Sequence, residues 1–440
     1  MSQEPEQPQR AGQSRRRAPT QRRGSLLYGL VAIVAIAVVI GAVLLLTGGA
    51  PAAQPAPTAT SAPTATVPGP PTPTAVPTPE VPTPSAVMPA ATAQPAATPV
   101  TPSASTLVLT PAVRSDWYEV YFTSPKTPDD QKAHRGGIDQ RLVVLYDSAQ
   151  RTLDVAVYDF DLANVADAMA RAKARGVRVR MYTDSDTVAS KDEKVRAALQ
   201  TVRKAGIAIG EDKRQSIMHH KFSVVDGEWV ATGSMNYTDG DAYRLNNWTG
   251  IFHSRDLAAA YTFEFEQLIA GKTGSERDKA RSRASFTIGG TPVQLCFSPR
   301  GSCASLIVDT VKREAKTSIY FLAFSFTHDA IGASIIDKAK AGLRVSGVFE
   351  RTGSQTAFSE YPKMKKQGLD VYLDGNPYAM HHKVIVLDER VVVAGSFNFS
   401  NNADQDNDEN LLIVDDAAYA RAFKAEFDRV LDVAKRSPQQ

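Results

Sequence analysis

The segment 218–238 reads MHHKFSVVDGEWVATGSMNYT, and the segment 380–400 reads MHHKVIVLDERVVVAGSFNFS. The two segments match at 10 of 21 positions without a gap, whereas chance gives about one match at a ~1-in-20 rate. A shorter pair, YFTSP at 121–125 and CFSP at 296–299, precedes them. The chain from 106 onward is therefore predicted to be one unit repeated.

The same order of elements is predicted around the repeated segment in both copies. Apolar spacing and flanking glycines predict helices at 137–149, 162–174, 303–315 and 328–341, and strands at 153–158, 177–182, 319–324 and 343–349. Strand–helix–strand order with a right-handed crossover predicts a largely parallel sheet covered by helices. We therefore expect an α/β fold of two tandem lobes, 106–275 and 290–437, related by an approximate two-fold axis and facing each other across the repeated segments.

Each copy contains the spacing H-x-K-x4-D-x6-G-S-x-N. Its residues are His219, Lys221, Asp226, Gly233, Ser234 and Asn236 in the first copy, and His381, Lys383, Asp388, Gly395, Ser396 and Asn398 in the second. Alternate strand residues face the same way, so the histidine and lysine of a copy share one side. A two-residue hairpin turn at 226–227 would bring the serine and asparagine back beside them. We expect both sets to meet around one anionic group.

Other polar residues of the repeat are assigned supporting roles. His220 and His382 should face the opposite side and pack there, and Asp226 and Asp388 are expected to stabilise turns or ion pairs. The two motif serines lie in no G-x-S-x-G elbow, so we expect them to hydrogen-bond near the histidines. No metal site is predicted, because adjacent strand histidines diverge and the chain has two cysteines. Cys296 and Cys303 are candidates for a disulfide.

The duplicated motif resembles the HKD motif of the phospholipase D superfamily, in its compact bacterial phospholipase D-like and endonuclease branch. The resemblance implies phosphodiester hydrolysis through a phospho-histidine, with no cofactor and no metal. One histidine attacks phosphorus, and the other protonates the leaving oxygen. Four side chains would hold the non-bridging oxygens: Lys221, Lys383, Asn236 and Asn398.

One difference between the copies predicts different roles for the two histidines. Glu409 lies 28 residues after His381, where the resemblance implies an acid bonded to the histidine, whereas Asn247 lies 28 residues after His219. A carboxylate partner raises the pKa of an imidazole, and an amide does not. We therefore predict that Glu409 keeps His381 protonated as the general acid and that His219 is the neutral nucleophile. Asp239 or Asp241 could supply a further acid that the sequence does not place.

The first 105 residues differ in composition from the rest. Residues 1–25 carry six Arg and two Glu, residues 26–47 are uncharged and mostly apolar, and residues 48–105 are rich in Pro, Thr and Ala. The apolar run can span the ~30 Å hydrocarbon layer as a helix. We expect a basic cytoplasmic tail, a single transmembrane helix and a disordered extended linker, with the lobes outside the cell membrane. A cleaved signal peptide is the alternative.

The balance of basic and acidic residues in the predicted lobes narrows the possible classes of substrate. Residues 106–440 hold 44 basic (50−6) and 44 acidic (47−3) residues, which disfavours a broad basic face for duplex nucleic acid. We predict a membrane-tethered phospholipase D that hydrolyses phospholipids to phosphatidate. An extracellular endonuclease acting on single-stranded or duplex nucleic acid, and an inactive module that binds phosphate-bearing surfaces, are the alternatives. Lys363, Lys365 and Lys366 could line a phosphate-rich substrate or form a solvated helix face. One chain supplies both motifs, so a monomer suffices.

Overall fold

The computed structural model describes residues 109–272 and 274–438. The tail, the transmembrane helix and the linker predicted for 1–105 lie outside these residues. Within the described ranges, no helix combines the length and the apolar character that crossing a bilayer requires.

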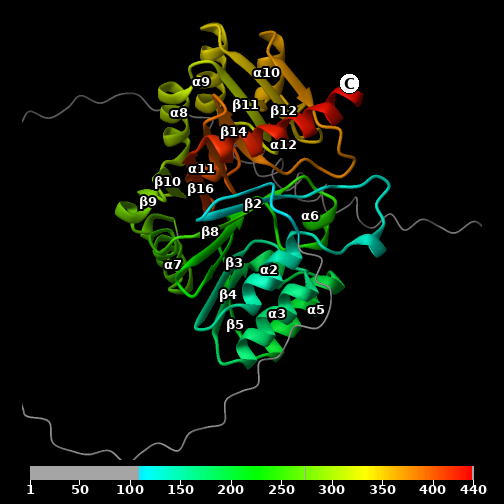
Figure 1. Ribbon diagram of the computed structural model, residues 1–440, viewed down its shortest axis with the longest axis vertical. Helices are drawn as coiled ribbons and strands as arrows, with labels where there is room; N and C mark the ends of the chain where they lie inside the picture. The colour runs from blue at the N-terminus through cyan, green and yellow to red at the C-terminus, as the bar shows by residue number, and fades with distance from the viewer. Residues whose placement is uncertain (1–108, 273, 439–440) are drawn as a thin grey trace, which may run out of the picture. The chain divides into compact units, whose positions relative to one another are not determined.

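Two eight-stranded sheets form the two lobes, drawn in cyan to green and in yellow to red in Figure 1. The first sheet has the order β1-β2-β8-β7-β6-β3-β4-β5, and the second has β13-β12-β11-β14-β15-β16-β10-β9. Read in opposite directions, the two orders are the same. The strands of the first sheet are β1 (Val113–Arg114), β2 (Tyr118–Phe122), β3 (Thr152–Val157), β4 (Arg178–Asp184), β5 (Ala208–Asp212), β6 (Lys221–Val225), β7 (Trp229–Gly233) and β8 (Trp248–His253). Those of the second are β9 (Arg283–Ile288), β10 (Thr291–Ser298), β11 (Ser318–Ala323), β12 (Arg344–Phe349), β13 (Asp370–Leu373), β14 (Lys383–Leu387), β15 (Val391–Gly395) and β16 (Glu409–Asp415).

The prediction of largely parallel sheets is wrong. Parallel pairs are confined to the predicted strand–helix–strand units, β3-β4 and β11-β12, and to one further strand beside each, β5 and β13, which the sequence analysis did not predict. The motif strands β6 and β14 pair antiparallel with β3 and β11, and hairpins join them to β7 and β15. Antiparallel pairs therefore outnumber parallel pairs in both sheets, because a hairpin forces its two strands to run in opposite directions.

Helices cover the sheets, as Figure 1 shows for α2, α3 and α5 beside the first sheet and α8 and α9 beside the second. The longer helices are α2 (Ile138–Asp147), α3 (Ala163–Ala174), α5 (Glu193–Lys204), α7 (Arg255–Ile269), α8 (Cys303–Glu314), α9 (Asp329–Lys340), α10 (Glu360–Lys366) and α12 (Ala417–Arg436). Shorter helical segments are η1 (Gln131–Ala133), α4 (Ser185–Val188), α6 (Asp239–Tyr243), η2 (Gly274–Glu276), η3 (Lys279–Arg281) and α11 (Asn401–Gln405). The four helices predicted from apolar spacing form within four residues of the expected bounds, because residues at i, i+3, i+4 and i+7 bury one face.

The two lobes share a hydrophobic core. One cluster of buried side chains belongs to each lobe alone, and a third contains residues of both sheets together with α7 and α12. Tyr118 packs edge-on against Tyr419 with ring centroids 5.2 Å apart, and Trp248 packs in the same way against Phe423. This shared core fixes the position of one set of motif strands relative to the other.

Reciprocal backbone contacts join the lobes beside the two motifs. Met218 forms a parallel bridge with Asp408, and Asn246 forms one with Met380. Equivalent motif residues of the two copies are 162 positions apart, so Met218 corresponds to Met380 and Asn246 to Asp408. Exchanging the lobes therefore converts the first bridge into the second. Such a relation is what a two-fold axis produces. The approximate two-fold arrangement predicted from the repeat is therefore present at the motifs.

Candidate active site

The motif glycines allow the motif hairpins to approach the next strand. A Cβ atom on Gly233 would lie 2.2 Å from the carbonyl oxygen of Trp248, and one on Gly395 would lie 2.1 Å from that of Asn410. No side chain fits at such a distance, so glycine is required at both positions. The close approach places β8 and β16 beside the serine and asparagine that follow each glycine.

The motif aspartates stabilise the connections at the far ends of the hairpins. Asp226 accepts hydrogen bonds from the backbone N–H groups of residues 150–152, and Asp388 accepts from those of residues 316–318. Each connection contains three residues, 226–228 and 388–390, so the two-residue turn predicted at 226–227 is wrong. Asp226 and Asp388 themselves adopt positive φ values of 55° and 53°, which aspartate tolerates better than most residues.

Each motif histidine is held by the opposite lobe. His219 Nδ1 lies 2.8 and 2.9 Å from the two carboxylate oxygens of Glu409. His381 Nδ1 lies 2.9 Å from Oδ1 of Asn247. The backbone N–H of His219 also donates to the carbonyl of Asp408, and that of His381 donates to Asn246, both at 2.9 Å. Nδ1 is engaged in both rings, which leaves Nε2 available for chemistry.

The predicted pairing of Glu409 with His381 is therefore wrong. Glu409 begins β16, and the bridge between Met218 and Asp408 brings the start of that strand to the motif of the first lobe. In each copy, the residue 28 positions after the motif histidine consequently reaches the histidine of the other copy. The physical argument that assigned a protonated state to His381 loses its premise, because its first partner is an amide.

Burial dominates the electrostatics of the two histidines, each of which is 6% exposed. Burial lowers the pKa of His219 well below its usual range, and the charges of Lys221 and Lys383 lower it further. Burial and Lys383 lower the pKa of His381 to about 4, although Asp241 opposes this shift. That each histidine responds to the lysines of both lobes places the two imidazole–ammonium sets in one electrostatic environment.

Glu409 is itself fully buried. Burial raises the pKa of its carboxyl to about 8, against the lowering effect of Lys221 and Lys383. Its oxygens also accept from the Ser396 hydroxyl and the Asn398 backbone N–H. The contact of both carboxylate oxygens with Nδ1 of His219 fixes the ring in one orientation.

Both motif lysines are buried and held in place by their own strands. Lys221 Nζ donates to the carbonyl of His219 and Lys383 Nζ to that of His381, each at 2.7 Å. They lie over the rings of Tyr158 and Phe324, at 5.2 and 4.5 Å from the centroids. Burial lowers the pKa of Lys221 to about 8 and that of Lys383 well below its usual range. An anion that reaches the site would favour the charged form of both lysines.

Of the two motif asparagines, Asn236 is buried and Asn398 is half-buried. The side-chain nitrogen of Asn236 faces the Asp241 carboxylate at 3.4 and 3.5 Å, so the structure does not present it as a free donor. The side-chain oxygens of Asn236 and Asn398 are buried and have no partner among the described residues. Buried polar atoms without partners are rare and are typical of functional sites.

The motif serines support the residues that hold the histidines. Ser234 Oγ donates to Oδ1 of Asn247 at 2.7 Å and accepts from the backbone N–H of Trp248. Ser396 Oγ accepts from the N–H of Asn410 at 3.0 Å and reaches Glu409. Neither serine is arranged as a nucleophile, because each hydroxyl is committed to this network.

The histidines next to the motif histidines face a second pair of acids that the sequence analysis missed. His220 Nε2 lies 3.2 Å from Glu264 on α7, and His382 Nε2 lies 2.8 Å from Glu426 on α12. Each acid follows its histidine by 44 residues. That shared spacing is the signal that could have identified both pairs.

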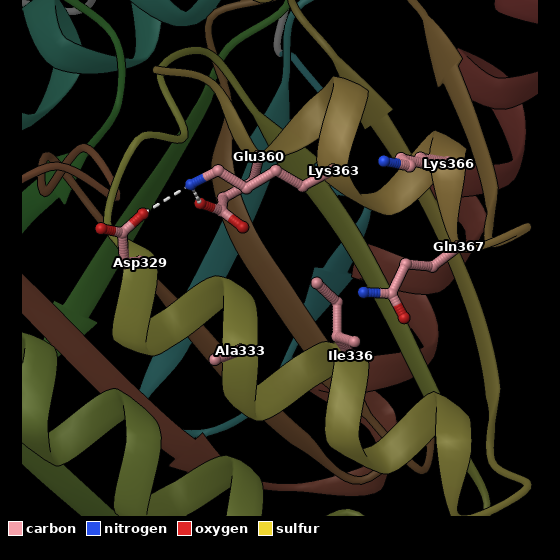
Figure 2. A pocket seen from close by; sticks show the side chains of 7 residues that line it. All are labelled: Asp329, Ala333, Ile336, Glu360, Lys363, Lys366 and Gln367. Atoms are coloured by element: carbon pink, nitrogen blue, oxygen red, sulfur yellow. Dashed lines mark hydrogen bonds and ion pairs between the residues drawn. The ribbon is translucent and has the colours of Figure 1, made fainter. Parts of the chain in front are cut away.

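Two other predicted features lie in the second lobe. Cys296 and Cys303 form a disulfide that joins β10 to the start of α8. In the lysine cluster, Lys363 pairs with Asp329 and Glu360 at 2.6 and 2.7 Å. Figure 2 shows these three side chains at a pocket of about 650 Å³ between α9 and α10, which no motif residue lines. A buried acid at this pocket argues against binding a phosphate there.

The described part of the chain contains no group of three or more histidine, cysteine or acidic side chains arranged to hold a metal ion. The groups that the two motifs bring together are two imidazoles, two ammonium groups, two amides and their acidic partners. A phosphodiester is an anion that these cationic groups can neutralise.

Comparisons with known proteins agree with this geometry. Residues 142–269 and 310–431, more than half of the chain, match the family model described as cardiolipin synthase, PLD-like domain. A phospholipase D of Rickettsia bellii is 33% identical over 131 residues, which is 30% of this chain and 65% of that protein. A mitochondrial cardiolipin hydrolase of Xenopus tropicalis is 37% identical over 135 residues, which is 31% of this chain and 62% of that protein. The chain thus spans slightly less than two thirds of these relatives.

A solved structure extends the likeness of fold to both lobes. The phosphatidylserine synthase of Haemophilus influenzae Rd KW20 is 13% identical, with a TM-score of 0.51 over 68% of this chain and 84% of that one. At this level of identity the similarity concerns the fold alone.

Proposed function

Because the chain belongs to the phospholipase D superfamily, we propose that it is a phosphodiesterase that hydrolyses phospholipids to phosphatidate and a free head group. One observation carries the proposal: two buried histidine–lysine sets, one from each lobe, whose histidines are anchored by residues of the opposite lobe. One chain thus supplies both halves of the site, which makes a monomer sufficient. An inactive binding module would not need both complete sets.

His219 is the nucleophile in this proposal. Its Nε2 attacks phosphorus and the bond from phosphorus to the head-group oxygen breaks, which leaves a phosphatidyl-histidine. Attack makes the ring cationic, and Glu409 at 2.8 Å from Nδ1 stabilises that charge. The role first assigned to His219 is kept, but the reason for it is now the carboxylate beside its own ring.

His381 is the general acid and then the general base. It gives the Nε2 proton to the departing head-group oxygen and later takes a proton from the water that attacks the phosphatidyl-histidine. Lys221 and Lys383 hold the non-bridging oxygens throughout, and burial strengthens their attraction for the negative charge that develops. Asn398 is proposed to bind the same oxygens, whereas the side-chain nitrogen of Asn236 is directed at Asp241.

Phospholipid is favoured over nucleic acid as the substrate. The named relatives are a phospholipase D and a cardiolipin hydrolase. The equal numbers of basic and acidic residues in 106–440 also argue against a surface that tracks a polyanion. We further propose that residues 26–47 anchor the chain in the cell membrane, which would keep the lobes near a lipid substrate.

The test is a substrate assay with the full chain in the presence of a chelator. Mixed phospholipid vesicles and single-stranded DNA are supplied separately, and His219→Ala serves as the control. We expect phosphatidate from the vesicles, no cleavage of DNA, and no product with the variant. Cleavage of DNA alone would replace the lipid assignment by a nuclease, and loss of all activity on chelation would contradict the metal-free mechanism.

A further inference from the structure

The two lobes place their acidic side chains at different positions behind the histidines. The residue 28 positions after the motif histidine is Asn247 in the first copy and Glu409 in the second. The residue 22 positions after it is Asp241 in the first copy and Ala403 in the second. The carboxylate therefore lies on different elements in the two lobes. In the first lobe it is on the short helix α6, and in the second it is on the strand β16.

Asp241 is bonded to the residue that holds His381. Its Oδ1 accepts from Nδ2 of Asn247 at 3.0 Å, and its backbone carbonyl accepts from the same nitrogen at 3.1 Å. Oδ1 also lies 3.3 Å from Nδ1 of His381. Asp241 is 6% exposed and Asn247 is fully buried, so water does not screen these contacts.

These contacts decide which way Asn247 is turned. Its nitrogen faces two acceptors of Asp241, while its oxygen accepts from Ser234 at 2.7 Å and faces Nδ1 of His381 at 2.9 Å. With its oxygen toward the ring, Asn247 requires a proton on Nδ1 of His381. In the neutral ring Nε2 is then unprotonated, and in the cationic ring it carries the proton for the leaving group.

We propose that Asp241 is a positioning residue for His381, which fixes the tautomer of the ring through Asn247 and supplies the negative charge that stabilises its imidazolium form. Asp241 would thus do for the general acid what Glu409 does for the nucleophile, from a different place in the fold. The inference rests on the proposed function, because it assumes that His381 donates a proton to the leaving group.

The surroundings of His381 explain why this charge is needed. Lys383 on β14 and Lys221 on β6 both disfavour its cationic form, as does burial. Asp241 on α6 is the acid in direct contact with the ring. Four further acids act on these buried lysines: Glu409 on both, Asp159 and Asp184 on Lys221, and Glu350 on Lys383. Without Asp241, His381 would be harder to protonate, and the leaving group would depart without its proton.

Asp241 also has structural contacts, which the experiment must separate from its action on His381. Its carboxylate accepts from the Thr238 hydroxyl at 2.9 Å and from the Asn236 backbone N–H at 3.1 Å. Thr238 is the N-terminal cap of α6. Thr238→Val removes the cap and leaves the acid in place, so it is the matched control for loss of structure at this helix.

The first measurement compares leaving groups in Asp241→Asn. On phospholipid vesicles, whose head-group alcohol needs a proton, we expect kcat to fall about 10-fold to 100-fold with little change in KM. On bis(p-nitrophenyl) phosphate, whose leaving group departs as an anion, the loss should stay below about threefold. The alkaline limb of kcat should move to lower pH, because the acid form of His381 is less stable. Thr238→Val should affect both substrates equally.

The second measurement moves the carboxylate in the first lobe to the place that it has in the second. Asp241→Ala combined with Asn247→Glu gives the first lobe an alanine 22 positions and a glutamate 28 positions after its motif histidine, as in the second lobe. We expect the double variant to recover phospholipid hydrolysis to within about threefold to tenfold of the native chain, well above Asp241→Ala alone. Equal losses on both substrates, without recovery in the double variant, would overturn the proposal.

A spectroscopic readout keeps this inference separate from the proposed function. The chain has seven histidines, and long-range ¹H–¹⁵N spectra of the full chain with ¹⁵N-labelled histidine report the tautomer of each ring. His381, assigned with His381→Gln, should carry its proton on Nδ1 in the native chain and lose that preference in Asp241→Asn. If the native chain cleaves no phosphodiester but this change occurs, the proposed function fails and the positioning role stands. An unchanged tautomer in the variant overturns the positioning role.

Discussion

The histidine of the first lobe faces a carboxylate, whereas the histidine of the second lobe faces an amide with a carboxylate behind it. The strands, glycines and lysines around the two rings otherwise correspond. Duplication has therefore preserved the geometry that brings the rings together and altered the charge beside each one. Two titrating groups in different surroundings can act as nucleophile and acid at the same pH.

The comparison also shows that neither lobe holds a complete site. Glu409 of the second lobe supports the histidine of the first, and Asn247 of the first supports the histidine of the second. The shared core and the two reciprocal bridges keep these partners in register. Changes that act on only one side of this arrangement are the best tests of it.

The largest expected difference between the lobes comes from the histidines themselves. His219→Ala should reduce turnover of phospholipid by about 10⁴-fold or more, because no covalent intermediate forms. His381→Ala should retain a burst of phospho-enzyme on bis(p-nitrophenyl) phosphate, because that leaving group needs no acid and the water step is slowed. Peptide mass spectrometry of the native chain, quenched during turnover and digested without acid, checks the site of the phosphoryl group. Phosphate found on His381 would reverse the roles.

Glu409→Gln tests the carboxylate beside the proposed nucleophile, His219, and should reduce kcat by about 10³-fold. The amide can turn its nitrogen toward Nδ1 of His219, which would move the ring proton to Nε2 and remove the attacking lone pair. Steady-state kinetics on the cleaved phospholipid measure the loss. Glu314→Gln, which changes a half-buried acid on α8 that pairs with Arg313 and Arg390, is the control and should leave kcat unchanged. A loss below tenfold in Glu409→Gln would show that orientation of His219 does not depend on this acid.

The arginines that pair with the acidic partners of His220 and His382 allow the two lobes to be compared by their effect on the free energy of unfolding. Arg277 is 4% exposed and pairs with Glu264 and, across the lobes, with Asp408. Arg429 is more exposed and pairs with Glu426 on its own helix. Arg277→Ala should lower the free energy of unfolding by about 3 kcal/mol, because two buried acids lose a partner.

Arg429→Ala is the matched variant, and its cost should be about 1 kcal/mol or less because water screens the more exposed Arg429–Glu426 pair. Denaturant unfolding of both variants measures the two costs. Equal costs would mean that the interlobe contact of Arg277 contributes little.

Much of the fold follows from local pattern. The apolar spacing of Val165, Ala168, Met169 and Ala172 places one face of α3 in the core, and all four are buried. The repeat predicted two lobes with the same strand order, because a duplicated sequence repeats every local choice. The sheet direction was predicted wrongly, since the predicted crossover units account for only two strands of each sheet and the motif hairpins reverse the chain.

The sequence predicted which residues form the candidate site, but it did not predict which acid contacts which histidine. The spacing of His219 and Lys221 is a property of one strand, so the sequence suffices to place them together. Which acid reaches which histidine depends on how one lobe contacts the other. The residue types found 22 and 28 positions after each motif histidine do not indicate that contact. Asp241 could be named as a candidate, but only the bond to Asn247 gives it a role.

The smallest expected effect concerns an acid that only the first lobe has. Asp159 follows β3, where the second lobe has Ser325, and its charge raises the pKa of Lys221, which burial lowers to about 8. In Asp159→Asn the alkaline limb of kcat/KM should move down by a fraction of a pH unit, because Lys221 loses its proton at lower pH. Burial raises the pKa of Asp159 itself to about 6, so the variant and the native chain should coincide at pH 5, where the acid is neutral. Profiles of kcat/KM from pH 5 to 9 measure both, with Ser325→Ala as the matched change in the other lobe. A limb that stays in place, or a difference already present at pH 5, would mean that the charge of Asp159 does not act on the lysine.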